Sequence, residues 1–351
     1  MNINRTDSNL QLLFRIGIVF SMQTILSGIK PSGTPHLGNY LGMLKPSLEL
    51  MKRPQTRCFY FMADIHALNT IQNRELLRQY TYEAAAAWIA LGLDPHQAIL
   101  YRESDIPEIS ELNSLLAHAV PKSLMNQAHA YKAITQKNQE AGNEDLDDGV
   151  NMGLFNYPIL MSADILAFDT DFVPVGKDQV QHLEITRDIA RRFNVRHGEC
   201  LKLPQVIVKE EVAVIPGLDG RKMSKSYENI IALFQPEKEM LKCINRIVTD
   251  TSPPEAPKDP DSSSLFAIYQ GFAAKDQIEE MRAHYAKGIG WGQMKKELFE
   301  VIRSALGDAY KIYQELMSHP EELDRIFNEG AKKARAIARP IVDRARNAVG
   351  F

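Results

Sequence analysis

Short β-rich runs alternate with longer segments of helical period between Thr24 and about Ala232. In the longer segments, apolar residues recur three or four positions apart, as they do on the buried face of a helix. This alternation predicts βαβ units, a parallel sheet and an α/β fold. The expected strands are 24–29, 57–63, 98–104, 172–175 and 203–208, and the expected helices are 36–50, 74–92, 107–119, 156–166 and 178–193.

Three stretches interrupt this pattern. Residues 1–21 precede a second methionine, Met22, and are expected to form an extension outside the fold. Residues 135–150 are too polar to bury, which predicts a mobile loop. Residues 251–264 contain four prolines that forbid a continuous helix, and the pattern beyond them is helical to the last residue.

These breaks suggest three parts: an N-terminal extension (1–21), a Rossmann-like domain with inserted helices (22–232) and a helical carboxyl-terminal domain (233–351).

The composition limits the possible classes of protein. With 41 basic and 44 acidic side chains the net charge is −3, so any nucleic acid must bind a local patch. Only three cysteines occur, without the spacing of a disulfide framework or a zinc site, which favours a reducing, cytoplasmic location. The apolar run at 11–21 is interrupted by Arg15 and is too short to span a bilayer, so we expect neither membrane insertion nor export.

The first informative motif is GIKPSGTPHLGNYLG, at residues 28–42, between the first expected strand and helix. Its glycines permit close backbone approach, and the helix amino end near His36 offers free N–H groups to an anion. The glycine spacing fits neither a dinucleotide fingerprint nor a P-loop. An ordinary βα turn with helix-packing glycines explains the spacing equally well.

The second motif is GRKMSKSYENI, at residues 220–230. Lys222 and Lys225 flank Ser224 in a loop that also contains Ser226, so ammonium groups, hydroxyls and loop amides could bind a polyphosphate. Taken alone, the segment is as easily a solvated basic loop.

Together the two motifs resemble the signatures of class I aminoacyl-tRNA synthetases. PHLGN at 35–39 is similar to the HIGH-type motif, with Asn39 in place of its last histidine, and 222–226 spells KMSKS in full. MADIHAL at 62–68 and the segment 156–194 are similar to the bacterial tryptophanyl-tRNA synthetases. The chain departs from that family at Lys30, where glutamine is commoner, and over 122–140; residues 1–21 have no counterpart.

The resemblance implies an ATP-dependent ligase that activates L-tryptophan and charges tRNA(Trp), releasing AMP and pyrophosphate. It also implies a homodimer in which the helical domain, 233–351, binds the tRNA and its anticodon. Mg²⁺ would be carried by ATP, with no dedicated protein cage for the metal. The implied catalytic residues are His36, Lys222, Ser224 and Lys225. The implied ATP-binding residues are Lys30, Pro31, Ser32, Gly38, Asn39, Gly176, Lys177, Asp178, Ile215, Lys222, Met223, Ser224, Lys225 and Ser226.

A tryptophan pocket is expected around Tyr157, Met161 and Asp164, which share one helix face because they are spaced i, i+4, i+7. A carboxylate on an otherwise apolar face is expensive to bury without a donor, and an indole N–H is such a donor. Tyr and Met are also ordinary core residues. By resemblance, Gln179 and Tyr157 would bind the ammonium group, and His66 would help to shape the pocket, although a structural histidine is nearly as well supported.

Two rival functions and one surface stay open. A tyrosyl-tRNA synthetase would have glutamine where Met161 stands, and a non-catalytic paralogue would not need the intact lysines and histidine of the two motifs. A basic cluster near the carboxyl end is either a phosphate-contacting patch or the solvated face of an amphipathic helix. It consists of Lys332, Lys333, Arg335, Arg339, Arg344 and Arg346, and the apolar residues expected on the opposite face are Ala334, Ile337, Ile341 and Val342.

Overall fold

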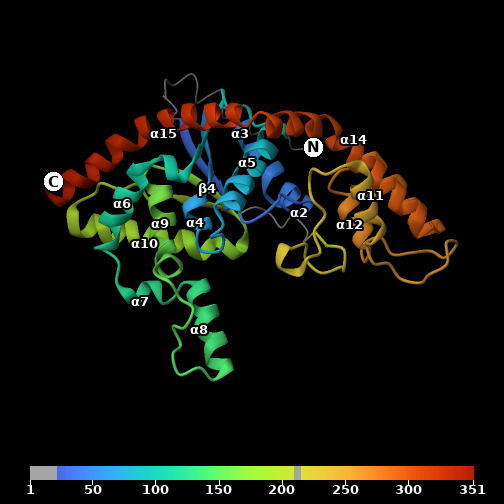
Figure 1. The fold of residues 1–351 in the computed structure, drawn as a ribbon, viewed down its shortest axis with the longest axis horizontal. Coiled ribbons are helices and arrows are strands. Elements are labelled where there is room, and N and C mark those ends of the chain that lie inside the picture. The colour runs from blue at the N-terminus through green and yellow to red at the C-terminus, as the bar shows by residue number, and fades with distance from the viewer. Residues whose placement is uncertain (1–21, 209–214) are drawn as a thin grey trace, which may run out of the picture.

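A parallel sheet of five strands forms the centre of the computed structural model, which describes residues 22–208 and 215–351 (Figure 1). Its strand order is β3-β2-β1-β4-β5. In the register, Ile25 lies between Cys58 of β2 and Phe172 of β4. The strands are β1 (Gln23–Ile29), β2 (Thr56–Met62), β3 (Ala98–Arg102), β4 (Phe172–Val175) and β5 (Gln205–Val208).

Helices cover both faces of the sheet, so its strands are apolar on both sides. Ile25, Tyr60 and Leu100 belong to one buried cluster, whereas the adjacent Leu26 and Phe59 belong to another. The helices of the α/β part are α2 (Leu37–Asn39), α3 (Lys45–Met51), α4 (Asp64–Ala67), α5 (Arg74–Ala90), α6 (Pro107–Ala117), α7 (Lys122–Met125), α8 (His129–Ala141), α9 (Met152–Leu166) and α10 (Val180–His197).

The remaining helices continue the core along one side of the sheet. α14 packs against α5, α11 and α12, and α15 returns across β3 and α6, forming the long arch in Figure 1. These helices are α11 (Glu237–Asn245), α12 (Ser264–Tyr269), α13 (Lys275–Lys287), α14 (Trp291–Ser318) and α15 (Pro320–Val349). The expected α/β fold with a helical carboxyl-terminal part is therefore confirmed.

The strand and helix predictions hold with two corrections. The helix expected at 36–50 is interrupted by a π-helical turn, η1 (Tyr40–Leu44), because Pro46 has no N–H to continue the α-helical ladder. The loop expected at 135–150 is helical as far as Ala141, because a projecting surface helix can remain polar on all sides (Figure 1). The segment that follows α8 is held against the helix by Asn138, whose amide donates to the carbonyls of Leu146 and Asp148 at 2.9 and 2.8 Å.

The segment 251–264 contains no helix until α12, as its prolines predict. Lys258 holds this turn from within: its ammonium group donates to the carbonyls of Pro253, Pro254 and Ala256 at 2.8, 3.3 and 2.9 Å. Among the residues that the structure describes, no helix combines the length and apolarity needed to cross a bilayer. The expected extension, 1–21, lies outside the described residues.

Candidate active site

Chemically active side chains gather at the carboxyl edge of the sheet. Lys30 follows β1, His66 lies in α4 just after β2, Glu103 follows β3, and Gly176 follows β4. Loops at this edge of an open parallel sheet are the usual ligand site of such folds.

The first motif forms a compact helix start around His36. The Asn39 N–H donates to Nδ1 of His36 at 3.3 Å, and the His36 N–H donates to Oδ1 of Asn39 at 3.1 Å. Burial, with the Lys225 charge adding to it, lowers the pKa of His36 to about 4, so the ring is neutral at physiological pH. Because Nδ1 accepts, the ring proton resides on Nε2, which is a donor suited to a phosphate oxygen.

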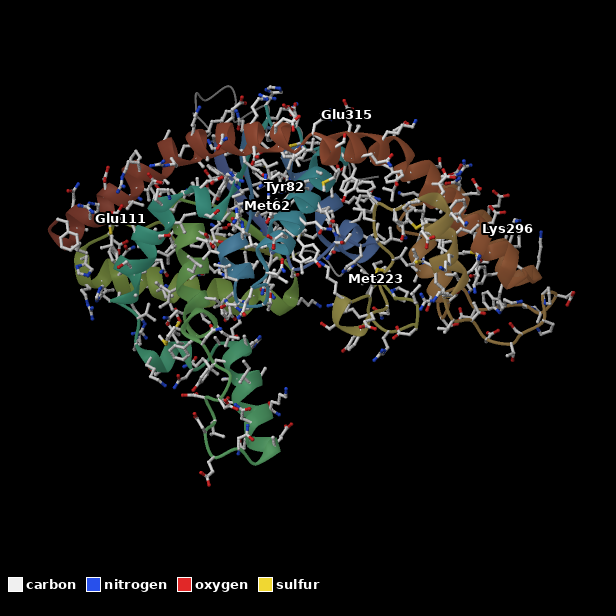
Figure 2. All side chains as sticks on the ribbon, viewed as in Figure 1. Met62, Tyr82, Glu111, Met223, Lys296 and Glu315 are labelled. Atoms are coloured by element: carbon white, nitrogen blue, oxygen red, sulfur yellow. The ribbon has the colours of Figure 1, made fainter. Side chains whose placement is uncertain are left out.

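Backbone pairing joins the two motifs although they are far apart in the sequence. His36 and Ala232 form an antiparallel bridge, and the Leu37 N–H donates to Ile231 O at 3.0 Å. The Gly38 N–H points at Sδ of Met223 at 3.4 Å, across 185 residues of chain. Figure 2 shows Met223 between the α/β part and the helical part. A Cβ on Gly38 would lie 3.0 Å from Nδ1 of His36 and 3.5 Å from Cβ of Met223, so glycine keeps this crowded position between the motifs clear.

Asn229 is buried beneath the KMSKS loop and determines its shape. Its Oδ1 accepts from the Ser224 N–H at 2.8 Å, and its Nδ2 donates to Oδ1 of Asp219 at 2.6 Å and to Lys222 O at 3.1 Å. This one amide thus fixes three points of the loop, while Lys222 and Ser226 stay exposed.

Lys225 reaches from this loop to the first motif. Its Nζ donates to Gly33 O at 2.6 Å. Burial lowers the pKa of Lys225 to about 8, an effect that the Glu83 carboxylate partly opposes. Gly33 has φ of 139°, and a Cβ there would lie 2.9 Å from Cδ of Lys225, so this position needs glycine both for its backbone and for its space.

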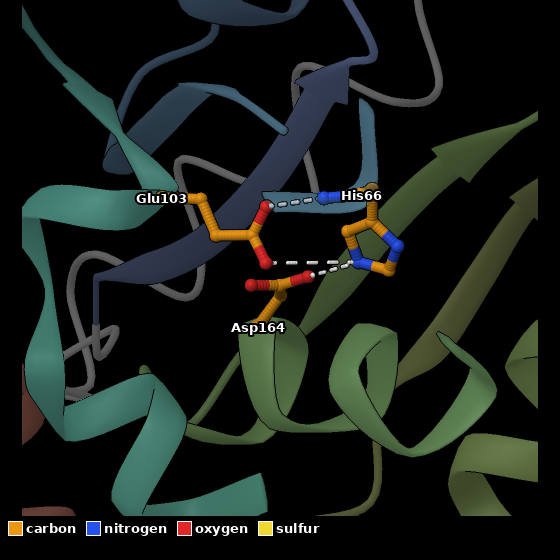
Figure 3. A group of neighbouring side chains, drawn as sticks. All are labelled: His66, Glu103 and Asp164. Atoms are coloured by element: carbon orange, nitrogen blue, oxygen red, sulfur yellow. Dashed lines mark hydrogen bonds and ion pairs between the residues drawn. The ribbon is translucent and has the colours of Figure 1, made fainter. Parts of the chain in front are cut away.

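Asp164 is fully buried in α9, where one face of the helix meets the sheet edge. Its Oδ2 lies 3.0 Å from Nε2 of His66 (Figure 3), and its Oδ1 has no hydrogen-bond partner in the part of the chain that the structure describes. Burial raises the pKa of Asp164 well above its usual range, and the charge of Asp64 adds to the shift. Burial also lowers the pKa of His66, so this imidazole is neutral. One buried carboxyl oxygen is therefore left without a donor.

Tyr157, two helical turns from Asp164, is half-buried, and its ring lies 6.3 Å from that of His66, centroid to centroid. Its hydroxyl lies 2.5 Å from Nε2 of His182, a buried residue of α10. Met161 lies between Tyr157 and Asp164 in the sequence of α9 and is partly buried, whereas the neighbouring Ile165 and Leu166 are in the core. Tyr157 and Asp164 thus both contact His66.

The other expected ATP-binding residues lie in the loops at the sheet edge. Ser32 is exposed, Pro31 is buried, and burial lowers the pKa of Lys30. Gly176 and Lys177 are exposed at the end of β4, and Gln179 is partly buried at the start of α10. Ile215 is buried, and its carbonyl accepts from the Met223 N–H at 2.8 Å. The side chain of Asp178 lies outside the described part of the chain.

Two residues of the site were not identified from the sequence. Glu103 is fully buried beside His66 and Asp164, and Asn229 supports the KMSKS loop. An acid and an asparagine in loops carry no local signal of burial. The only signal was positional: Glu103 directly follows a strand, as His66 does.

The basic cluster near the carboxyl end is largely neutralised by the α/β part. Arg335 pairs with Glu108, Arg339 and Arg346 pair with Glu111, and Arg344 pairs with Asp169. Figure 2 shows Glu111 below α15. Ala334, Ile341 and Val342 are buried and Ile337 is partly buried. The structure therefore favours the amphipathic-helix interpretation of this segment, and Lys332 and Lys333 remain exposed.

Comparison with known proteins agrees with this geometry. The family model of class I tRNA synthetases (W and Y) matches residues 22–307. The chain belongs to this family. Within it, the tryptophan–tRNA ligase of Pseudomonas aeruginosa is 49% identical over 330 residues, which are 93% of this chain and 73% of that protein. The tryptophan–tRNA ligase of Neisseria meningitidis is 46% identical and is covered to 98%, with 94% of this chain aligned.

Solved structures of the family show the same fold. The tryptophanyl-tRNA synthetase of Campylobacter jejuni, complexed with ADP and tryptophan, superposes with a TM-score of 0.84 at 40% identity, covering 94% of this chain and 100% of that one. The enzyme from Mycoplasma pneumoniae superposes with a TM-score of 0.76 at 28% identity, covering 94% and 98%.

Proposed function

We propose that this chain is a tryptophan–tRNA ligase that uses ATP to form tryptophanyl-adenylate and then charges tRNA(Trp). The observation that carries the choice of amino acid is the buried Asp164, which lies beside His66 and whose Oδ1 has no hydrogen-bond partner among the residues that the structure describes. The relatives named tryptophan–tRNA ligase, aligned over nearly the whole chain, support the same substrate.

The first chemical step joins the tryptophan carboxylate to the α-phosphorus of ATP as the bond to pyrophosphate breaks. This step needs positioning and charge neutralisation rather than a protein nucleophile. We assign the leaving pyrophosphate to Lys222, Lys225 and the Ser224 hydroxyl. Nε2–H of His36 and the amide of Asn39 would bind phosphate oxygens, and Gly38 would leave room for adenine.

The other ATP contacts are assigned to Lys30, Pro31 and Ser32 after β1, to Gly176, Lys177 and Asp178 after β4, and to Ile215, Met223 and Ser226. For the amino acid, Asp164 would accept the indole N–H, with Met161 and His66 lining the pocket. Tyr157 and Gln179 would bind the ammonium group.

Mg²⁺ is expected to arrive with ATP. Within residues 22–208 and 215–351, the group whose ligand atoms are close enough for a metal is His66, Glu103 and Asp164, which lies in the amino-acid pocket. The phosphate side presents lysines, a neutral histidine and hydroxyls, which are poor ligands for Mg²⁺. The metal would therefore be held by phosphate oxygens and water. A cytoplasmic homodimer remains the expected form of the enzyme.

Pyrophosphate exchange with each of the twenty amino acids tests the proposal. We expect exchange that depends on tryptophan, with tyrosine and phenylalanine at least about 10³-fold weaker in kcat/KM. Preference for tyrosine would support the tyrosyl alternative, which the named relatives do not favour. No exchange with any amino acid would support the non-catalytic paralogue.

A further inference from the structure

Glu103 forms an acid pair with Asp164 that the synthetase motifs do not account for. Both side chains are fully buried. Each has one oxygen without a hydrogen-bond partner among residues 22–208 and 215–351: Oε1 of Glu103 and Oδ1 of Asp164. Both carboxyl groups approach the same ring nitrogen: Nε2 of His66 lies 3.0 Å from Asp164 and 3.8 Å from Glu103 (Figure 3). The ligand atoms of the three residues lie within 4.8 Å of one another.

Two buried carboxyl groups this close cannot both be ionised without a counter-ion, so the pair retains a proton. His66 does not supply the counter-ion, because its pKa is lowered by burial. Of the other groups facing the pair, Asp64 is a further acid and Tyr101 is a fully buried phenol of β3. A cation, Lys30 after β1, also acts on this group: its charge lowers the pKa of His66 further.

The number of donors indicates which member of the pair is ionised. With the ring proton on Nε2, His66 donates to Asp164 at 3.0 Å. Within the described part of the chain, Oδ1 of Asp164 has no partner, so it can accept one further donor. From the described residues, Glu103 receives only the His66 backbone N–H, in a long bond of 3.4 Å. Negative charge is most stable on the carboxyl with the stronger donors.

We propose that Glu103 is a positioning residue for tryptophan selection, which keeps the proton of the acid pair so that Asp164 stays an anionic acceptor for the indole N–H. This inference rests on the proposed function. The pocket's preference for an N–H donor then depends on two acids, Asp164 as the acceptor and Glu103 as its protonated neighbour.

The proposal predicts a pH dependence. Burial, with the charge of Asp164 adding to it, raises the pKa of Glu103 to about 9. Glu103 is therefore protonated below that pH and ionised above it, where a second negative charge repels Asp164. Bound tryptophan excludes water from the pair and so favours the singly protonated state. By linkage, the affinity for tryptophan falls by up to about tenfold per pH unit above about pH 9.

Three single variants test the proposal by equilibrium dialysis of labelled tryptophan without ATP, which removes Lys225 and His36 from the measurement. Glu103→Ala should weaken binding by about 30-fold or more at neutral pH, and Glu103→Gln, a permanently neutral isostere, should recover most of that loss. Asp164→Asn, the matched change in the other acid, should weaken binding by about 100-fold or more, because an amide is not an anionic acceptor. The alkaline fall in affinity should be present in the wild type and absent from Glu103→Gln.

The ratio of the two pH profiles cancels the titration of the tryptophan ammonium group itself. Equal losses of tryptophan affinity in Glu103→Gln and Asp164→Asn would overturn the proposal. So would the same alkaline fall in affinity in Glu103→Gln as in the wild type. A change of wild-type affinity on adding EDTA would also overturn it, because the three residues would then hold a metal.

Two further results keep the test decisive. If a variant does not fold by circular dichroism, infrared spectra of the wild type decide: a protonated-acid carbonyl band should persist with tryptophan bound at neutral pH and disappear in alkali, and its absence at neutral pH contradicts the proposal. Tryptophan-dependent pyrophosphate exchange by the wild type is measured first. If the wild type shows no such exchange, the proposed function is wrong. If the wild type is active but the variants do not behave as expected, only the role proposed for Glu103 is wrong.

Discussion

The ATP motifs depend on the charge of single residues that are partly removed from water. Lys225 is the clearest case, because burial lowers its pKa to about 8, close to the working pH. An ammonium group with few waters interacts strongly with phosphate, since the local dielectric constant is low. The same burial makes the charge easier to lose as the pH rises.

We expect Lys225→Ala to slow adenylate formation by about 10²-fold or more in stopped-flow experiments and to change the dissociation constant of tryptophan by less than about threefold. The control is Lys296→Ala, an exposed lysine of α14 far from the motifs (Figure 2), which should retain wild-type activation. If Lys225→Ala weakens tryptophan binding as much as it slows adenylate formation, the loop has a structural role instead.

The pH profile of kcat/KM for ATP provides a second measurement on this lysine. The cation is present below its pKa and lost above it, so kcat/KM should fall as the pH rises through about 8. Lys225→Arg stays charged throughout this range, and we expect its profile to lack that alkaline limb. An unchanged limb in the arginine variant would assign the titration to another group.

The proposed function assigns the choice of amino acid to Asp164. We expect Asp164→Ala to lower kcat/KM for tryptophan by about 10²-fold or more and to narrow its advantage over phenylalanine, which has no ring N–H. Steady-state activation assays with both amino acids measure this, with circular dichroism to confirm folding. Wild-type kinetics and selectivity in the variant would place the pocket elsewhere.

At the scale of elements, the KMSKS loop has little regular structure and is held by side-chain hydrogen bonds. Its one helical turn, η4 (Lys225–Tyr227), ends at Glu228 with φ of 52°. Asn229 supplies three of the hydrogen bonds that close the loop. The loop's order therefore depends on one buried amide.

Asn229→Ala should leave buried backbone groups unpaired, destabilising the chain by about 1–3 kcal/mol and slowing adenylate formation by about tenfold or more. Urea unfolding, stopped-flow activation and limited proteolysis around 220–230 measure the three effects. Asn347→Ala, an exposed asparagine of α15, is the matched control. Full activity in Asn229→Ala, with the loop still resistant to protease, would show that the loop holds without this amide.

The docking of α15 depends on a glycine at its crossing with β3. A Cβ on Gly330 would collide with the carbonyl of Leu100, which is backbone and cannot move aside. Gly330→Ala should therefore cost about 2 kcal/mol or more, by lifting the helix from the strand. On α14, a Cβ on Gly307 meets nothing within 4 Å, so Gly307→Ala should stabilise the chain by about 0.5–1 kcal/mol. Urea unfolding measures the stability of both variants. Equal changes in the free energy of unfolding would contradict the close approach of Gly330 to Leu100.

At the scale of the whole molecule, charge joins the carboxyl-terminal helix to the α/β part. Arginines 335, 339, 344 and 346 all reach acids of the α/β part. These pairs are partly exposed, so each contributes at most about 1 kcal/mol. Together they keep α15 in register over α6 and β3.

Glu111 binds two of these arginines, and hydrogen bonding to Arg339 is the largest of the effects that lower its pKa. A lowered carboxyl pKa means that the stabilisation is complete above the ordinary value of 4.5 and is lost as the pH falls through the folded-state pKa. Glu111→Gln should therefore lower the free energy of unfolding by about 0.5–2 kcal/mol at pH 7 and by less under acidic conditions. Glu300→Gln, whose partner Arg303 lies on the same helix, is the control. Urea titrations at pH 7 and under acidic conditions measure this. If the loss of unfolding free energy is as large in acid as at pH 7, the ion pairs are not its cause.

Local patterns determined the strands, most helices and the two ATP motifs. Alternating β-rich and helical segments require only near neighbours, and the strands at 24–29 and 57–63 agree with β1 and β2 to within a residue at each end. His36 and the KMSKS lysines were recognisable because their residue types occur in short continuous patterns. The helix spacing of Tyr157, Met161 and Asp164 likewise follows from the geometry of one element.

Tertiary structure alone decided which polar groups lost water and which charges found partners. Glu103 meets His66 across 37 residues, and His66 meets Asp164 across 98. The sequence could not choose between a phosphate patch and a solvated helix face for the arginines of α15, because their acids lie more than 200 residues earlier. Glu108 and Glu111 are 227 and 228 residues from Arg335 and Arg339. Burial and pairing depend on atoms brought together by the fold, and both the proton of the acid pair and the neutralised arginines follow from those contacts rather than from any local sequence.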